Sequence, residues 1–184
     1  PPRSTLSPSS AASDVYKRQY MHFVGIIINN FFACLATIFL GYFLCKLELR
    51  IYRKVSLETY RRFDRAFDPF YSFLGKMSSI FRKAKPCFRS CLLYLILIPS
   101  LALILNTIVI FYVLVSCPKY LLPHGILEIP AIYASVYLGY SIFEHNKNIL
   151  LSEKFEISLP RGIFVKVSAL LLAFTFSAWL ECMA

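Results

Sequence analysis

The chain of 184 residues is 58% hydrophobic and only 16% charged, and it carries a formal net charge of +10. Its mean hydropathy is +0.60, whereas soluble domains carry about 25% charged residues. This composition excludes an ordinary soluble globular protein and indicates an integral membrane protein. The positive charge of so apolar a chain points to an anionic membrane surface before it points to nucleic acid.

The first nineteen residues do not read as natural protein sequence. Residues 9–19, SSAASDVYKRQ, resemble the translation of a transposase-type sequencing adapter, and residues 1–5 resemble the primer that precedes it. We therefore set residues 1–19 aside as a non-native, adapter-derived segment, and we expect the natural chain to begin upstream of Tyr20. Without this segment the formal charge is +8, because three positive charges and one negative charge are lost.

Four apolar segments of the remaining single domain, residues 20–184, are long enough to cross a bilayer. About 20 apolar residues in a helix span a hydrocarbon core of about 30 Å. The sequence predicts transmembrane helices over residues 23–45, 92–116, 125–143 and 163–180, with a kink at Pro99 in the second. The expected fold is therefore an all-α, polytopic membrane helix bundle with about four transmembrane helices and an amphipathic cytoplasmic insertion.

The segment 46–91, between the first two predicted spans, holds twelve basic and four acidic residues. The positive-inside rule places a short loop with this excess of Lys and Arg in the cytoplasm. Chain order then puts the C-terminus and the motif at residues 123–131 near the outer face. We expect a multi-pass protein of the cell membrane.

Within this basic loop, apolar side chains recur at spacings of three and four residues, which predicts an amphipathic helix on the membrane surface. Asp68 before Pro69 is typical of a helix start, so we expect a break there. Anionic lipid headgroups or a cytoplasmic partner helix would bind this loop, although packing beneath the bundle explains the pattern equally well. RNA contact lacks a recognition motif, and we expect no nucleic-acid partner. The basic residues assigned to the membrane surface are Arg61, Arg62, Arg65, Arg82 and Lys83.

The motif Pro-His-Gly-Ile-Leu-Glu-Ile-Pro-Ala at residues 123–131 places His124 and Glu128 one helical turn apart. A carboxylate on a membrane helix costs roughly 2.5–3.5 kcal/mol, so Glu128 should have a partner or a role. Further strongly polar residues fall in the outer half of the predicted spans, and we expect all of them to form one intramembrane polar site. They are Asn29, Asn30, Asn106 and Glu181.

Three interpretations of this polar site remain open. The side chains could join helices through hydrogen bonds, which average about 0.6 kcal/mol in membranes but fix helix register. They could form a proton or substrate site in which Glu128 titrates and His124 tunes it. They could also bind a metal ion through His124, Glu128 and Glu181.

The other chemistry-bearing residues point to no catalytic site. Pro123, Gly125 and Pro130 are expected to serve a turn, close helix approach and a kink. The six cysteines lack zinc-finger or disulfide spacing, so we expect no metal and no cofactor. The sequence contains no His-Glu-x-x-His helix, no Gly-x-Ser-x-Gly elbow and no Walker loop, and we expect no enzymatic activity.

Residues 122–131 resemble the signature of the stage II sporulation protein M family: proline, histidine, glycine, two apolar residues, glutamate, an apolar residue, proline and alanine. The resemblance covers residues 20–184 except the basic loop, although Thr107 and Phe111 stand where the family would have glycines. It implies a multi-pass membrane protein without established catalysis. In endospore formers the family is associated with a membrane complex that recruits peptidoglycan-degrading enzymes, and many relatives belong to organisms that make no spores. Matching polar residues outside the signature are Asn29, Asn30, Asn106 and Glu181.

Two functions are compatible with these features. The first is a membrane scaffold or assembly component whose loops recruit membrane or cytoplasmic protein partners. The second is a transporter or permease subunit with Glu128 and His124 facing a cavity. The second would be a homo-oligomer, because four short helices form only a small pathway.

Overall fold

The computed structural model describes the backbone of residues 8–54, 57–84, 86–116, 118–152 and 156–183. The side chains of these residues are described except at 8–20, 22, 23, 26, 57–61, 63, 64, 86, 87, 118–126 and 181–183. In these ranges the chain forms helices and no strand, so the all-helical prediction is confirmed for them. The helices are α1 (Pro8–Lys54), α2 (Leu57–Met77), α3 (Ser79–Lys83), α4 (Pro86–Ser116), α5 (Pro118–Leu151) and α6 (Ile163–Met183).

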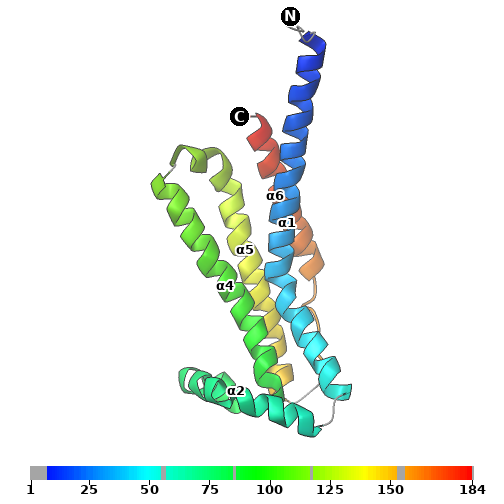
Figure 1. Ribbon diagram of the computed structural model, residues 1–184, viewed down its shortest axis with the longest axis vertical. Coiled ribbons are helices and arrows are strands. Elements are labelled where there is room, and N and C mark those ends of the chain that lie inside the picture. The colour runs from blue at the N-terminus through cyan, green and yellow to red at the C-terminus, as the bar shows by residue number, and fades with distance from the viewer. Residues whose placement is uncertain (1–7, 55–56, 85, 117, 153–155, 184) are drawn as a thin grey trace, which may run out of the picture.

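Four long helices, α1, α4, α5 and α6, run side by side, and α2 lies across one end of them (Figure 1). Helix α5 contacts α1, α4 and α6, and helix α1 contacts α4, α5 and α6. We term the end that carries α2 and α3 the basic end, and the opposite end, where α4 passes into α5, the distal end. Toward the distal end α1 and α4 lean apart (Figure 1).

Among the residues that the structure describes, three helices are long and apolar enough to cross a membrane. They comprise Ile27–Lys54 of α1, Phe88–Ser116 of α4 and Ile163–Leu180 of α6. Helix α1 continues beyond Cys45, where the first predicted span ends. Cys45 and Leu49 are buried while Lys46 and Arg50 are exposed, so the charged residues lie on the outer face of a helix that is still packed.

Two glycines set how closely the helices approach. A Cβ atom added at Gly41 of α1 would lie 2.7 Å from the carbonyl oxygen of Tyr94 in α4. At Gly139 of α5 it would lie 3.0 Å from the carbonyl oxygen of Thr37 and 3.1 Å from Cβ of Pro99. Small residues at helix crossings bring backbones into contact, which drives packing where the hydrophobic effect between helices is absent. The bundle is therefore tightest where α1, α4 and α5 meet.

The buried core lies mostly between these glycines and the basic end. It contains side chains from every helix except α2, and α2 adds the partly buried Leu74. By contrast, the part of α4 from Leu101 onward carries many exposed large apolar residues, as expected of a helix that faces lipid. Core side chains below 2% exposure include Phe88, Leu92, Ile142, Leu150 and Cys45.

The predicted break at Pro69 is wrong. Helix α2 runs through Pro69 without interruption, although proline leaves the carbonyl of Arg65 without its helical donor. Both residues are exposed, so water can satisfy that carbonyl. The break falls at Ser78 instead, where the Ser78 hydroxyl accepts a hydrogen bond from the Ile80 N–H at 3.4 Å and caps α3.

Candidate functional site

The structure joins Glu128 of α5 to Asn30 of α1. The side-chain amide of Asn30 donates a hydrogen bond to Oε1 of Glu128, and both side chains are half-buried. Asn29 lies on the exposed side and donates weakly to Oδ1 of Asn30 at 3.5 Å. Since Asn30 lies eleven residues before Gly41 in α1, on the side away from the basic end, the pair sits in the distal part of the bundle.

One helical turn from this pair, the same helices meet in a packed cluster. Cys34 of α1, Ala131 of α5 and Phe174 of α6 are each less than 10% exposed and contact one another. Ser135 is also buried, lies beside the Cys34 thiol and donates to the carbonyl of Ile132 at 2.7 Å. Small side chains at this level let α1 and α5 approach closely, and the Asn30–Glu128 bond closes the distal side of the contact.

The remaining predicted polar residues divide into two groups. The side-chain amide of Asn106 donates to the carbonyl of Ala102 in its own helix at 2.7 Å, so the structure does not bring Asn106 to Glu128. Pro123, His124 and Gly125 lie in α5 and Glu181 lies in α6, but their side chains lie outside the described residues. The metal-binding alternative through His124, Glu128 and Glu181 is therefore untested, and the expectation of no metal site is untested as well. Among described residues no group of three His, Cys, Asp or Glu could hold a metal ion.

Hydroxyl groups that sequence reasoning missed join α4 to α5. Ser100 and Tyr140 are 2.7 Å apart, and Thr107 and Tyr133 are 3.2 Å apart. Ser100 and Thr107 are seven residues apart in α4, and Tyr133 and Tyr140 are seven residues apart in α5. This spacing of Ser, Thr and Tyr in two neighbouring spans is the signal that could have revealed a polar seam.

A second half-buried carboxylate lies toward the basic end. Ser90 of α4 donates a short hydrogen bond to Oε1 of Glu48 in α1, and the Cys91 thiol lies 3.7 Å from Oε2. Cys45 and Cys91 are both 0% exposed. Sequence reasoning treated Glu48 as a loop residue because the predicted span ended at Cys45, whereas a helix continued by one turn places Glu48 against α4.

Asn146 is another polar residue that the sequence did not reveal. It is 0% exposed, and both polar groups of its side chain form hydrogen bonds. The amide nitrogen donates to the carbonyls of Ile142 and Ser158, and Oδ1 accepts from the Ser158 N–H. His145 Nε2 lies 2.9 Å from the Ser158 hydroxyl. This clamp ties the segment before α6 to the end of α5.

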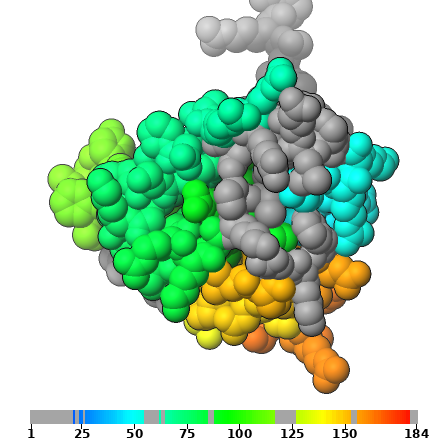
Figure 2. All heavy atoms as spheres, turned by 90° about the horizontal axis from the view of Figure 1, so that it is seen from below, coloured from blue at the N-terminus to red at the C-terminus, as the bar shows by residue number. Residues whose placement is uncertain are grey.

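The basic end presents the predicted surface residues on α2 and α3. The side chains of Arg62, Arg65, Arg82 and Lys83 are exposed, and that of Arg61 lies outside the described part. Seen from below, α2, α3 and the start of α4 spread over one half of this face, and the last turns of α1 and the segment before α6 lie around the rest (Figure 2). Large apolar side chains of α2 are also exposed: Phe67, Phe70, Phe73 and Met77, at 44–72%.

Fold and site together define a class of protein: a helical bundle with at least three helices of membrane-spanning length and a basic amphipathic helix across one end. The chain matches no protein-family profile, no curated protein and no solved structure.

Proposed function

We propose that this chain is a multi-pass membrane scaffold or assembly component of the stage II sporulation protein M type, with four membrane-spanning helices. The fourth span would be α5, which includes the signature residues 123–131. It is a 34-residue helix in contact with three others. A helix shielded by neighbours exposes less surface to lipid, so it needs fewer apolar residues than α1, α4 or α6.

In this proposal the basic end faces the cytoplasm. Helix α2 lies across the ends of the long helices (Figure 1), and its exposed Phe67, Phe70, Phe73 and Met77 suit an amphipathic helix lying in the membrane interface. Twelve Lys and Arg residues lie at positions 46–89. Such a concentration next to short spans favours the cytoplasmic side and anionic lipid headgroups as partners.

The observation that carries the scaffold assignment is the hydrogen bond between Asn30 and Glu128. It gives the costly carboxylate a partner on the neighbouring helix, directly beside the packed contact of Cys34, Ala131 and Phe174. A carboxylate used in this way fixes how α1 and α5 are placed relative to each other. The bundle would thereby hold its loops and α2 in fixed positions for protein partners in the membrane or the cytoplasm.

A transporter or permease subunit is the second candidate. The observation that favours it is that Glu128 is a half-buried carboxylate inside the apolar bundle, where ionisable groups commonly belong to substrate or proton pathways. In that function Glu128 would exchange its bond with Asn30 for a proton or a substrate during each cycle.

Reconstitution separates the two functions. The purified full chain and its Glu128→Gln variant are placed in vesicles that contain a pH-sensitive dye, and a proton gradient is imposed. The scaffold assignment predicts that both proteins melt at similar temperatures and pass protons no faster than empty vesicles, because glutamine still accepts the Asn30 hydrogen bond. Proton flux by the wild type that the folded Glu128→Gln variant loses would overturn the scaffold assignment.

A further inference from the structure

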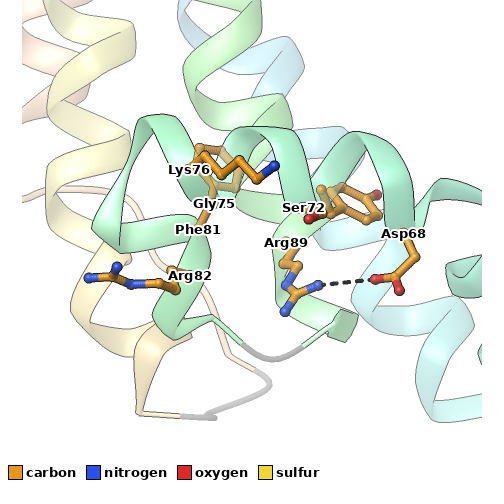
Figure 3. Close-up of a pocket in the computed structure, with 8 residues that line it drawn as sticks. Asp68, Ser72, Gly75, Lys76, Phe81, Arg82 and Arg89 are labelled. Atoms are coloured by element: carbon orange, nitrogen blue, oxygen red, sulfur yellow. Dashed lines mark ion pairs between the residues drawn. The ribbon is translucent and has the colours of Figure 1, made fainter.

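A cavity of about 390 Å³ opens at the basic end between α2, α3 and the start of α4. Its volume falls in the range of small-molecule sites, which is about 300–1,000 Å³. In Figure 3, Arg89 extends from α4 toward Asp68 of α2, Lys76 extends from α2, and Arg82 extends from α3 away from the Arg89–Asp68 pair. The lining residues are Asp68, Tyr71, Ser72, Gly75, Lys76, Phe81, Arg82 and Arg89.

The charge of this lining is positive. Three cationic side chains and one anionic side chain line the cavity, so the lining carries a net charge of +2. Arg89 is held in place, since its Nε donates to the carbonyl of Ala84 at 3.1 Å and its Nη1 lies 3.6 Å from Asp68. Within the part of the chain that the structure describes, Lys76 and Arg82 have no ion-pair partner. The cavity therefore offers Lys76 to an anion beside Arg89, which is already oriented, and Arg82 can join them by rotation of its side chain.

A bound anion can compete with Asp68 for the guanidinium of Arg89. The Asp68 side chain is 68% exposed, whereas that of Arg89 is only 20% exposed. An ion pair at 3.6 Å whose carboxylate is exposed contributes little, while a phosphate can accept two parallel N–H bonds from one guanidinium. The Ser72 hydroxyl adds a further donor to the lining.

The position of the cavity indicates which kind of phosphate compound it would bind. Buried Tyr71 and Phe81 form its apolar wall, and α2 carries the exposed Phe70, Phe73 and Met77 on its outer side. If those side chains enter the interface, as the proposed function requires, the polar flank of α2 lies at the depth of lipid headgroups. A phospholipid there could place its phosphate in the cavity while its acyl chains remain beside the apolar side chains.

We propose that this cavity is a binding site for the phosphate headgroup of an anionic phospholipid, a site more specific than general attraction to a basic surface. The proposal rests on the proposed function only in that the chain lies in a membrane with α2 at its surface. It applies equally to a scaffold and to a transporter, so its failure would leave the proton-flux result untouched.

The test compares two double variants that lose the same charge. Lys76→Gln/Arg82→Gln removes the two unpaired cavity cations, and Arg161→Gln/Lys166→Gln removes one exposed arginine and one exposed lysine outside the cavity. Binding of phosphatidylglycerol and of phosphatidylcholine to the full chain in detergent is measured by native mass spectrometry. We expect phosphatidylglycerol binding to weaken about tenfold in the cavity variant and to stay within about twofold of wild type in the control.

A second pair of variants fills the cavity without changing its charge. A Cβ atom added at Gly75 meets only ordinary contacts, the nearest at 3.7 Å from Cα of Arg82. Gly75→Met should therefore fold, extend into the cavity and weaken phosphatidylglycerol binding, whereas Gly75→Ala should bind like the wild type.

Three results would overturn the proposal. Equal losses in the two charge variants would show general surface attraction. Equal affinity of the wild type for phosphatidylcholine and phosphatidylglycerol would remove the preference for an anionic headgroup. Complete displacement of the bound lipid by millimolar inorganic phosphate would assign the cavity to free phosphate.

Discussion

Replacing Gly41 by alanine should force α1 and α4 apart at their closest approach. The added Cβ would lie 2.7 Å from the Tyr94 carbonyl oxygen, and ordinary contact begins at 3.4 Å, so the backbones must separate by about 0.7 Å. Because the obstructing atoms belong to a helix backbone, no side-chain rotation relieves the clash. Overpacking of this kind costs about 1–3 kcal/mol of unfolding free energy.

A control variant isolates this cost from helix propensity. A Cβ atom added at Gly25, also in α1, meets nothing within 4 Å, so Gly25→Ala gains the same propensity of up to about 1 kcal/mol without a clash. Gly139→Ala, with contacts at 3.0 and 3.1 Å, should fall between the two. The expected difference between Gly41→Ala and Gly25→Ala is about 1–3 kcal/mol.

Denaturant titration in detergent micelles measures this difference through a thiol-reactive dye. Cys34, Cys45 and Cys91 are buried and should react only when the helices separate. Equal midpoints for Gly41→Ala and Gly25→Ala would refute the close approach of α1 and α4.

Three further variants test other parts of the structure. Asn146→Leu should lower the unfolding free energy by about 2–3 kcal/mol, because it removes three hydrogen bonds to the backbone of Ile142 and Ser158. It should also speed hydrogen exchange at residues 156–160, and unchanged exchange would contradict the clamp. Tyr140→Phe removes the hydroxyl that bonds α4 and should cost about 0.6 kcal/mol, whereas Tyr137→Phe, at a side chain 70% exposed, should cost nothing measurable by the same titration; equal effects would contradict the α4–α5 bond. A cysteine in place of Lys83 should react with an impermeant maleimide only in inside-out vesicles, and extra labelling in intact cells, relative to wild type, would reverse the proposed orientation.

The all-helical fold and the membrane-spanning helices could be predicted, because a long apolar segment in lipid must satisfy its backbone hydrogen bonds within a helix or a closed barrel. The extent of α1 could not, since the prediction stopped at the first charged residue after Cys45. The structure shows that Lys46 and Arg50 are exposed while Leu49 is buried. A charge at the edge of an apolar run therefore marks one face of a helix and not its end.

The polar site could be predicted only where the residues stand out in apolar surroundings. Glu128 and Asn30 were both expected in it, and the structure joins them directly. Asn106 was expected to join them, but a side-chain amide can also bond the carbonyl four residues earlier, and here it does. The clamp at Asn146 depends on the loop from residue 156 to 160 folding back, which no local pattern in α5 reveals.

Through its hydrogen bond with Asn30, Glu128 joins α5 to α1. A double-mutant cycle tests this bond most directly, with Asn30→Ala, Glu128→Ala and the double variant compared by the same unfolding titration. We predict a coupling free energy of about 0.6–1.7 kcal/mol, the range found for hydrogen bonds between membrane helices. A coupling indistinguishable from zero, with each single variant folded, would contradict the claim.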